Sequence, residues 1–468
     1  VYLASSFFDP FKFFLLKMSK FVRSSKYRHV FGTPTKKENS YDNVKVTKSA
    51  WDSNKVKVNP KFVGVCWEAG GGGSVAVIPV ETVGKLKPDF PLVTGHKAPV
   101  LDIDWNPFND NILATGSEDA YVKVWFIPDG GLTEAATEAA QVLQGHKRKV
   151  GTIDFHPSAS NVLATSSTDF TVKLWDIEKG SELFNISSHA DIVQSVAWNF
   201  DGSLIATTCK DKKIRIFDPR TDTVASEVDG HQGVKGSRAC WLGRSNRLFT
   251  TGFGKTSERQ YMIFDSNDMA NPLVSTTIDN ASGLLMPFFD ADTNVLFLAG
   301  KGDGNIRYFE ITDEKDWIYY LSEYKSNSPQ VGMGYLPKRG VDVSTCEIAR
   351  LYKATPGMVE PISFQVPRKS DMFQDDLFPD TASGEPSLTA AEWSSGSNAE
   401  PKTMSLAPGF QAPAKPTQEL KFEKQVVDEG PKNENELRAE YEKLKTRVAY
   451  LEAELHKRDT RIKELEGK

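Results

Sequence analysis

A histidine, a serine, an aspartate and a tryptophan recur at fixed spacing, and these residue types can carry acid–base or nucleophilic chemistry. The clearest set is His146, Ser167, Asp169 and Trp175. We expect Asp169 to lie in a tight turn and accept a hydrogen bond from His146, and the serine hydroxyl to link the histidine to the indole. A buried polar set is costly when half satisfied and rigidifying when complete. We therefore interpret this set as structural rather than catalytic.

Three short runs rich in β-branched and aromatic residues fill the segment that holds this set, and turn-forming residues bound each run. This pattern is typical of one WD-repeat propeller blade. The preceding unit repeats the full set, and the following unit keeps two members with Cys209 at the hydroxyl position. Farther on, Asp303 keeps the turn but has no upstream histidine. The other predicted structural residues are His96, Ser117, Asp119, Trp125, His189 and Asp211.

Hydrophobic residues that close each unit recur every 42 to 50 residues. They are Ile78, Trp125, Trp175, Phe217, Phe264, Phe309 and, weakly, Tyr352. The spacing is close to the roughly 40–45 residues of a WD blade. The sequence therefore predicts an all-β seven-bladed propeller, which is a closed ring without long exposed edges. We expect the N-terminal segment 21–65 to complete the seventh blade.

The predicted propeller spans residues 18–355, and a disordered or non-native extension, residues 1–17, precedes it. Residues 1–17 lack the order of a signal peptide and the length of a membrane span, so we expect no stable membrane insertion. Residues 356–393 hold aromatic anchors without a repeat, and we expect them to pack on the propeller. Residues 394–433 have the Ser-, Pro-, Ala- and Lys-rich composition of a flexible linker.

Composition excludes several classes of function. The chain has 468 residues and a net charge of −5, which argues against a nucleic-acid binder. Its four cysteines show no CxxC spacing, so we expect neither a zinc site nor a disulfide framework. The glycine-rich stretches 70–73 and 300–304 lack the Lys-Ser/Thr of a phosphate loop. We expect no metal, no cofactor and no enzymatic activity. Basic residues, however, gather in residues 20–61.

The C-terminal segment, residues 434–468, carries apolar residues in alternating steps of four and three, which predicts a coiled coil. The alternative is a single amphipathic helix docked on the propeller. Arginine and glutamate flank two of the apolar pairs in a pattern similar to a known trimerisation motif. A parallel homotrimer is our first expectation and a dimer the second. The predicted trimer residues are Arg447, Val448, Leu451, Glu452, Arg461, Ile462, Leu465 and Glu466.

The chain resembles the coronins from Met18 to its end. The resemblance rests on strings such as Met18-Ser-Lys-Phe-Val-Arg, Gly300-Lys-Gly-Asp-Gly-Asn-Ile-Arg and Val366-Pro-Arg-Lys-Ser-Asp, combined with a terminal coiled coil. It implies a short, conventional coronin that is cytoplasmic, cortical and bound to filamentous actin. It also implies regulation of the branch-nucleating actin-related-protein complex and cooperation with cofilin.

The resemblance also suggests where the filament binds. The family's best-known actin contact is an arginine in an N-terminal strand motif, and Lys45 occupies that position here, which keeps the charge but loses the bidentate fork. We expect Lys26, Arg28 and Lys48 to assist, since actin's surface is acidic. The alternative is a general WD-repeat scaffold or trafficking adaptor without direct filament contact, because propellers host many functions.

Overall fold

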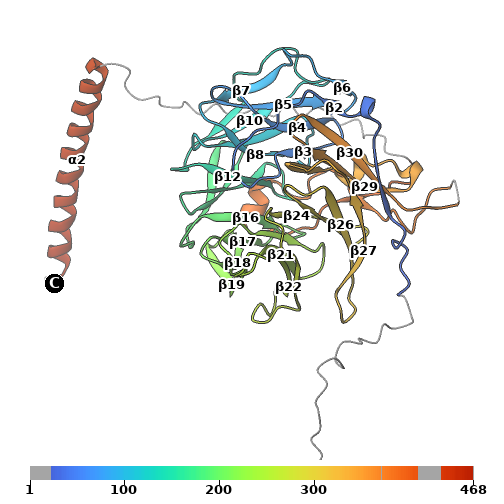
Figure 1. Ribbon diagram of the computed structural model, residues 1–468. Helices are drawn as coiled ribbons and strands as arrows, with labels where there is room; N and C mark the ends of the chain where they lie inside the picture. Colours follow the sequence, from blue (N-terminus) through green and yellow to red (C-terminus); the bar gives the residue numbers. More distant parts are fainter. Residues whose placement is uncertain (1–22, 370–371, 409–433, 467–468) are drawn as a thin grey trace, which may run out of the picture. The chain divides into compact units, whose positions relative to one another are not determined.

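The chain, seen as a computed structural model, folds into a ring of sheets and a separate helix. The structure describes residues 23–369, 372–408 and 434–466. Six four-stranded sheets and one six-stranded sheet form a ring (Figure 1), and their first strands line a central channel. The prediction of a seven-bladed propeller is confirmed. The chain divides into two units, Val1–Glu423 and Lys424–Lys468, which we describe separately.

Blades 1 to 6 are antiparallel meanders that run outward from the channel. Blade 1 consists of β3 (Val56–Val58), β4 (Phe62–Trp67), β5 (Gly73–Pro79) and β7 (Leu92–His96); blade 2 of β8 (Val100–Trp105), β9 (Ile112–Ser117), β10 (Val122–Phe126) and β11 (Gln141–Leu143); blade 3 of β12 (Val150–Phe155), β13 (Val162–Ser167), β14 (Val172–Asp176) and β15 (Ser181–Ile186). Blade 4 consists of β16 (Val193–Trp198), β17 (Ile205–Cys209), β18 (Lys213–Asp218) and β19 (Thr223–Asp229); blade 5 of β20 (Arg238–Trp241), β21 (Arg247–Phe253), β22 (Arg259–Asp265) and β23 (Val274–Asp279); blade 6 of β24 (Leu285–Asp290), β25 (Val295–Gly300), β26 (Asn305–Ile311) and β27 (Ile318–Lys325).

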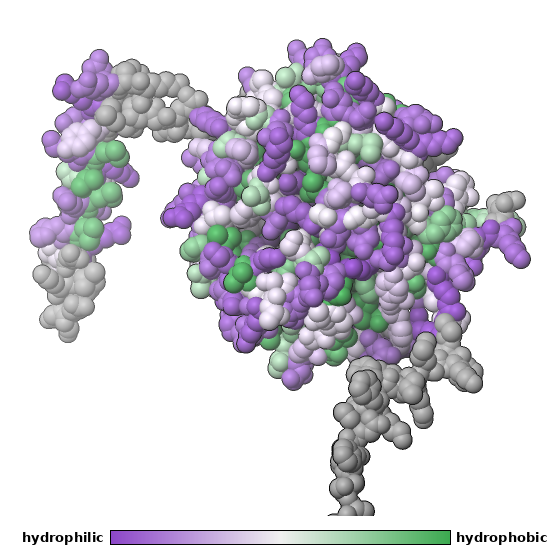
Figure 2. Space-filling model, in the orientation of Figure 1, coloured by the Kyte–Doolittle hydropathy of each residue, from purple (hydrophilic) through white to green (hydrophobic). Residues whose placement is uncertain are grey.

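Burial along the strands follows from this arrangement. Each blade packs against a neighbour on both of its faces, so a second strand such as β13 is buried at all six positions. The outermost strand β19 borders solvent and is mostly exposed. Apolar residues therefore lie between blades, and hydrophilic side chains cover most of the face that Figure 2 shows.

Blade 7 closes the ring with strands from both parts of the chain. Its inner strands are β28 (Gly332–Tyr335), β29 (Glu347–Ala354) and β30 (Met358–Gln365). The N-terminal strands β1 (Phe31–Pro34) and β2 (Tyr41–Asp42) both pair with β30, and β6 (Gly84–Lys85) pairs with β2. The sheet therefore continues past residue 355. Six of the predicted closing residues lie on third strands, whereas Tyr352 lies on the second strand of its blade.

The chain after β30 packs on the propeller through several of its described residues, the last of which is Leu406. It contains the short pair β31 (Thr381–Ala382) and β32 (Thr403–Met404) and the helix α1 (Ala390–Ser394). Thr389 caps α1 through a capping box with Glu392. Trp393 and Leu406 are fully buried. Residues 394–408, which we expected to belong to the linker, therefore include packed structure.

The second unit is one helix, α2 (Glu434–Glu466). Its length of 33 residues corresponds to about 50 Å. No helix among the described residues combines the length and the apolar character that a membrane crossing requires. The expected N-terminal extension and most of the expected linker lie outside the described residues.

Candidate functional site

The two ends of the propeller differ, and each needs a name. We call the end where the loops holding His96, His146, His189 and His231 lie the histidine end. The opposite end is contacted by residues 381–404, and we call it the extension end. There, the Ser387 amide donates to the Ser158 carbonyl over 2.8 Å, and the Trp393 indole donates to the Gly202 carbonyl over 3.0 Å.

Blades 1 and 2 meet at a complete polar set. His96 Nδ1 lies 2.9 Å from Asp119 Oδ2, and His96 Nε2 lies 2.7 Å from the Thr115 hydroxyl. The Trp125 indole donates to the same hydroxyl over 2.9 Å. Because the carboxylate can only accept, Nδ1 donates to it, and in the neutral imidazole Nε2 then accepts from the Thr115 hydroxyl, so every member is satisfied. Blade 3 repeats the set with His146, Asp169, Thr165 and Trp175.

The hydroxyl in this set corrects our prediction, which named Ser117 and Ser167. Both serines lie at the end of their strands, where the Ser117 hydroxyl donates to the Ala98 carbonyl over 2.8 Å and accepts from the Asp119 amide. They are too close to the turn to reach the indole. The threonine two residues earlier points to the same side of the strand. A Thr recurs at this register, at positions 115, 165, 207 and 250, and this recurrence was the sequence signal for it.

Later blades keep only parts of the set. His189 bonds the Thr207 hydroxyl at 3.0 Å, but Asp211 pairs with Arg215 at 2.7 Å instead of with the histidine. Asp303, for which the sequence offered no histidine, pairs with the guanidinium of Arg259 at 2.8 Å. Arg259 also holds Asp279 through two bonds of 2.6 Å. A buried arginine thus joins blades 5 and 6 where a histidine joins earlier blades.

The pKa values of these groups agree with a structural role. Burial alone would raise the pKa of Asp169, but hydrogen bonds from His146 and Thr171 outweigh it and hold the pKa below its usual range. Burial lowers the pKa of His189 and of His231 to about 4. These two histidines are therefore neutral near pH 7, and each has one buried nitrogen without a hydrogen-bond partner among the described residues. Neither is poised near neutrality as a general acid or base would be.

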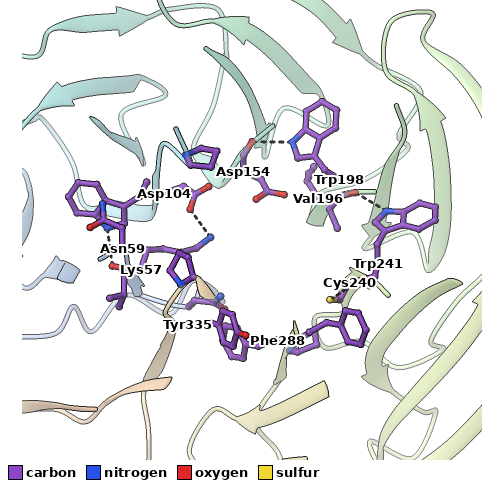
Figure 3. A pocket seen from close by; sticks show the side chains of 18 of the residues that line it. Lys57, Asn59, Asp104, Asp154, Val196, Trp198, Cys240, Trp241, Phe288 and Tyr335 are labelled. Atoms are coloured by element: carbon purple, nitrogen blue, oxygen red, sulfur yellow. Dashed lines mark hydrogen bonds and ion pairs between the residues drawn. The ribbon is translucent and has the colours of Figure 1, made fainter. Parts of the chain in front are cut away.

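The central channel contains a cavity of about 430 Å³. Figure 3 shows Asp104, Asp154 and Lys57 pointing into it, with Phe288 and Tyr335 on its wall. Lys57 Nζ lies 3.0 Å from Asp104 Oδ1. Burial, and then the neighbouring Asp104 carboxylate, raise the pKa of Asp154 to about 8. Among the described residues, no cluster of three His, Cys, Asp or Glu side chains could hold a metal ion.

The four basic residues predicted to act together are divided between the two ends. Lys45 and Lys48 are exposed at the histidine end, beside the β4–β5 turn, where the Lys45 carbonyl accepts from the Glu68 amide over 2.7 Å. Lys26 and Arg28 precede β1, whose start pairs with the last residue of β30 at the extension end. Lys26 donates to the Asp376 carbonyl there. They cannot belong to one patch with Lys45.

Further exposed cations share the histidine end with Lys45 and Lys48, and the sequence analysis missed them. They lie in the loops after the blade histidines and in the β17–β18 and β21–β22 turns. They are Lys97, Lys147, Arg148, Lys210, Lys212 and Lys255. Within the described part of the chain, none of these charged groups forms an ion pair. The signal for two of them was the lysine that directly follows His96 and His146.

The helix α2 exposes a line of large apolar side chains. Tyr441, Leu444, Val448, Leu451 and Leu455 are each 48% to 62% exposed, and Figure 2 shows apolar side chains gathered along one side of the helix. Arg447 and Glu452 are exposed beside them. The side chains of the second predicted trimer motif, residues 461–466, lie outside the described ones, although their backbone is helical.

Comparisons with known proteins agree with one another over most of the chain. Residues 89–125, 138–176 and 180–218 match the WD domain, G-beta repeat, residues 359–401 match a type of WD40 repeat, and residues 20–85 match a domain of unknown function, DUF1899. Coronin-A of Dictyostelium discoideum is 60% identical over 449 residues, which cover 96% of this chain and all of that protein. Human Coronin-2B is 47% identical and covers 95% of each chain.

A solved structure of a coronin domain is also similar to this chain. The WD40 domain of Toxoplasma gondii coronin superimposes with a TM-score of 0.77 at 32% sequence identity. The match covers 81% of this chain and 97% of that domain. The relatives cover both the propeller and the C-terminal segment. The 60% identity to Coronin-A over 449 residues and the structural match together show that the chain belongs to the coronin family.

Proposed function

We propose that this coronin is a non-enzymatic protein that binds filamentous actin through the histidine end of its propeller. In this role it regulates cortical actin turnover and branched-network assembly in the cytoplasm. Its further partners would be the branch-nucleating actin-related-protein complex and cofilin, as the family resemblance implies. The observation that carries the proposal is the set of eight exposed cations at the histidine end that form no ion pair among the described residues.

Electrostatics supports this choice of end. Lys45 and Lys48 lie beside blade 1, and Lys97, Lys147 and Lys210 extend the positive charge across the following blades. The carboxylates nearest to Lys97 and Lys147, those of Asp119 and Asp169, bind histidines and form no ion pair with the lysine side chains. An acidic partner would meet complementary charge over several blades, which raises the association rate and sets orientation.

Oligomerisation through α2 would add avidity to the weak contacts of single lysines. Exposed pairs between lysine and carboxylate contribute only about 0.2–1 kcal/mol each. The apolar line on α2 is too exposed for an isolated helix, and its spacing favours a coiled coil. The arginine and glutamate residues that flank it favour a parallel homotrimer, with a dimer as the second choice. Three propellers on one stalk would engage neighbouring filament subunits and gain about 10²–10⁴ in avidity.

Co-sedimentation with actin filaments tests the proposal. The full chain should pellet at low salt, and added salt should release it, because exposed charges are screened. A chain truncated after Glu429 should pellet about a hundredfold less tightly. A general WD-repeat scaffold or trafficking adaptor, the alternative function, would stay in the supernatant at every salt concentration.

Sedimentation equilibrium tests the oligomer separately. The full chain should have three times its monomer mass of 51.9 kDa, and the truncated chain should be monomeric. A Leu451→Asp chain is the matched variant, because it places a charge in the apolar line without shortening the chain. A full-length monomer would contradict the trimer and leave propeller binding to be judged from the pelleting experiment.

A further inference from the structure

A short segment of the chain crosses the histidine end of the central channel. We call residues 48–54 the strap. It leads from residues 45–47, which pair with the end of β4, to β3 beside the channel. On its way it contacts blades 3, 5 and 6, which are remote from it in sequence. The ring therefore fixes the strap from several sides.

Blade 3 holds the strap through Trp51. The indole nitrogen donates to the Gly151 carbonyl over 2.7 Å. The ring lies directly on Gly151, because a Cβ at that position would be 1.9 Å from Trp51 Cζ2. No other residue type leaves room for the indole there. The absence of a side chain at Gly151 is therefore what seats Trp51.

Blades 5 and 6 hold the next residue. Arg238 donates to the Asp52 carbonyl, and Lys301 Nζ lies 2.8 Å from Asp52 Oδ1 and 3.3 Å from the Trp51 carbonyl. Within the strap's own neighbourhood, the buried Lys55 ammonium donates to the Thr47 and Ser49 carbonyls over 3.0 Å each. Three cations thus bind the strap backbone.

Lys48 lies between two of these fixed points. Its amide donates to Glu68 Oε2 over 2.7 Å, and the Ser49 carbonyl that follows it is held by Lys55. Its side chain stays exposed. Lys45 is held differently, by the backbone bond between its carbonyl and the Glu68 amide. The Trp51 amide donates to the Ser49 hydroxyl over 3.2 Å, so displacing Trp51 would disturb Ser49 and Lys48 beside it and leave Lys45 in place.

We propose that Gly151 and Trp51 are positioning residues that hold the strap, and Lys48 in particular, in the conformation that binds the filament. The inference rests on the proposed function, because Lys48 matters here as a contact to the acidic partner. Ordering a flexible lysine-bearing segment before binding lowers the cost of immobilising it in the complex. Residues of blades 3, 5 and 6 thereby position Lys48 for its contact with the filament without touching the filament themselves.

Gly151→Ala tests this, since the new Cβ takes the space of the indole. Gly357→Ala is the matched control: it lies in the β29–β30 turn at the same end, and a Cβ there meets nothing within 4 Å. In filament co-sedimentation with the full chain, Gly151→Ala should weaken binding three- to tenfold, and Gly357→Ala less than twofold. Trp51→Ala, which removes the contact without adding an atom, should match Gly151→Ala.

A double-mutant cycle separates positioning from general damage to the fold. In a Lys48→Ala chain the effect of Gly151→Ala should fall below twofold, whereas in a Lys45→Ala chain it should persist. Equal losses in both backgrounds, or no loss with either strap variant, would overturn the inference while the wild type still pellets. A wild type that never pellets would overturn the proposed function itself and this inference with it.

Discussion

The two ends of this propeller use their positive charges in different ways. At the extension end, arginines are engaged within the molecule: Arg339 pairs with Asp110, Arg244 with Glu400 at 3.0 Å, and Arg220 with Asp218 at 3.1 Å. At the histidine end, lysines such as Lys97 and Lys147 are exposed and unpaired within the described residues. The extension end thus uses these arginines within the molecule, and the histidine end leaves eight cations without an ion pair among the described residues.

The blade histidines explain part of this difference. At the histidine end, Asp119 and Asp169 accept hydrogen bonds from His96 and His146 and form no ion pair with the neighbouring Lys97 and Lys147. The same polar sets that join the blades therefore leave the neighbouring lysines unpaired. At the extension end no such set exists among the described residues, and the carboxylates are available to arginines.

Trp393→Ala should have the largest effect on stability and none on filament binding. The side chain is fully buried between Trp198 and His156, with its indole bonded to Gly202. Removing a large buried aromatic side chain costs about 3–5 kcal/mol. Denaturant unfolding measures this loss. If filament affinity fell while stability did not, the extension end would be the binding surface, and the roles assigned to the two ends would be reversed.

Thr165→Val should destabilise more than Ser167→Ala. The valine keeps the shape but leaves His146 and Trp175 without their shared hydroxyl, at about 1–3 kcal/mol for each buried group left unsatisfied. Ser167 bonds only the Arg148 carbonyl and the Asp169 amide at the edge of the turn. Thermal unfolding of the two variants under identical conditions compares them. Equal shifts in Tm would argue for the expectation from the sequence, in which the Ser167 hydroxyl links His146 to the Trp175 indole.

Acid should weaken the ring in two stages. Burial lowers the folded pKa of His189 and His231 to about 4, so the unfolded chain binds more protons below about pH 6.5 and stability falls from there towards pH 4. The depressed pKa of Asp169 means that its contribution is present above about pH 4 and is lost below it.

A substitution at His231 tests whether buried histidines cause the first stage. A His231→Gln chain has one fewer buried histidine to protonate. Its stability should change less steeply between pH 6.5 and 4, by up to about 1.4 kcal/mol per pH unit. Denaturant unfolding across this range measures the slope. An unchanged slope would show that His231 does not titrate as its burial implies.

The smallest expected effects concern the cations that follow the blade histidines. Lys97→Gln and Lys147→Gln should each weaken filament binding about two- to threefold, because single exposed ion pairs contribute little. Both should also reduce the salt dependence of binding. Lys315→Gln, an exposed lysine beyond β26 towards the extension end, is the control and should change neither. Identical behaviour of the three chains would remove the distinction between the two ends.

Periodicity in the sequence revealed the ring but not its two ends. The recurring Trp125, Trp175 and Phe217 marked the blades, because each closes a strand buried on both faces. The Ser/Thr exchange was missed because Ser167 and Thr165 face the same side of one strand, and only the turn geometry decides which one reaches the indole. Arg259 was missed because its partners Asp279 and Asp303 lie 20 and 44 residues away.

The basic segment shows the same limit. Lys26, Arg28, Lys45 and Lys48 are close in sequence, and charge alone suggests one patch. The strands β1 and β2 carry the chain along β30 from one end of the blade to the other. Seven residues of an extended strand span about 23 Å, which separates the two pairs. Only the pairing of these strands, which needs the folded ring, reveals the division.

Charge reversal at the two ends tests the central claim most directly. We would compare filament co-sedimentation of the full chain with Lys45→Asp, at the histidine end, and Lys26→Asp, at the extension end. The account predicts that Lys45→Asp weakens binding at least tenfold and that Lys26→Asp stays within twofold of the wild type. A Lys26→Asp chain that loses binding while Lys45→Asp pellets normally would contradict it.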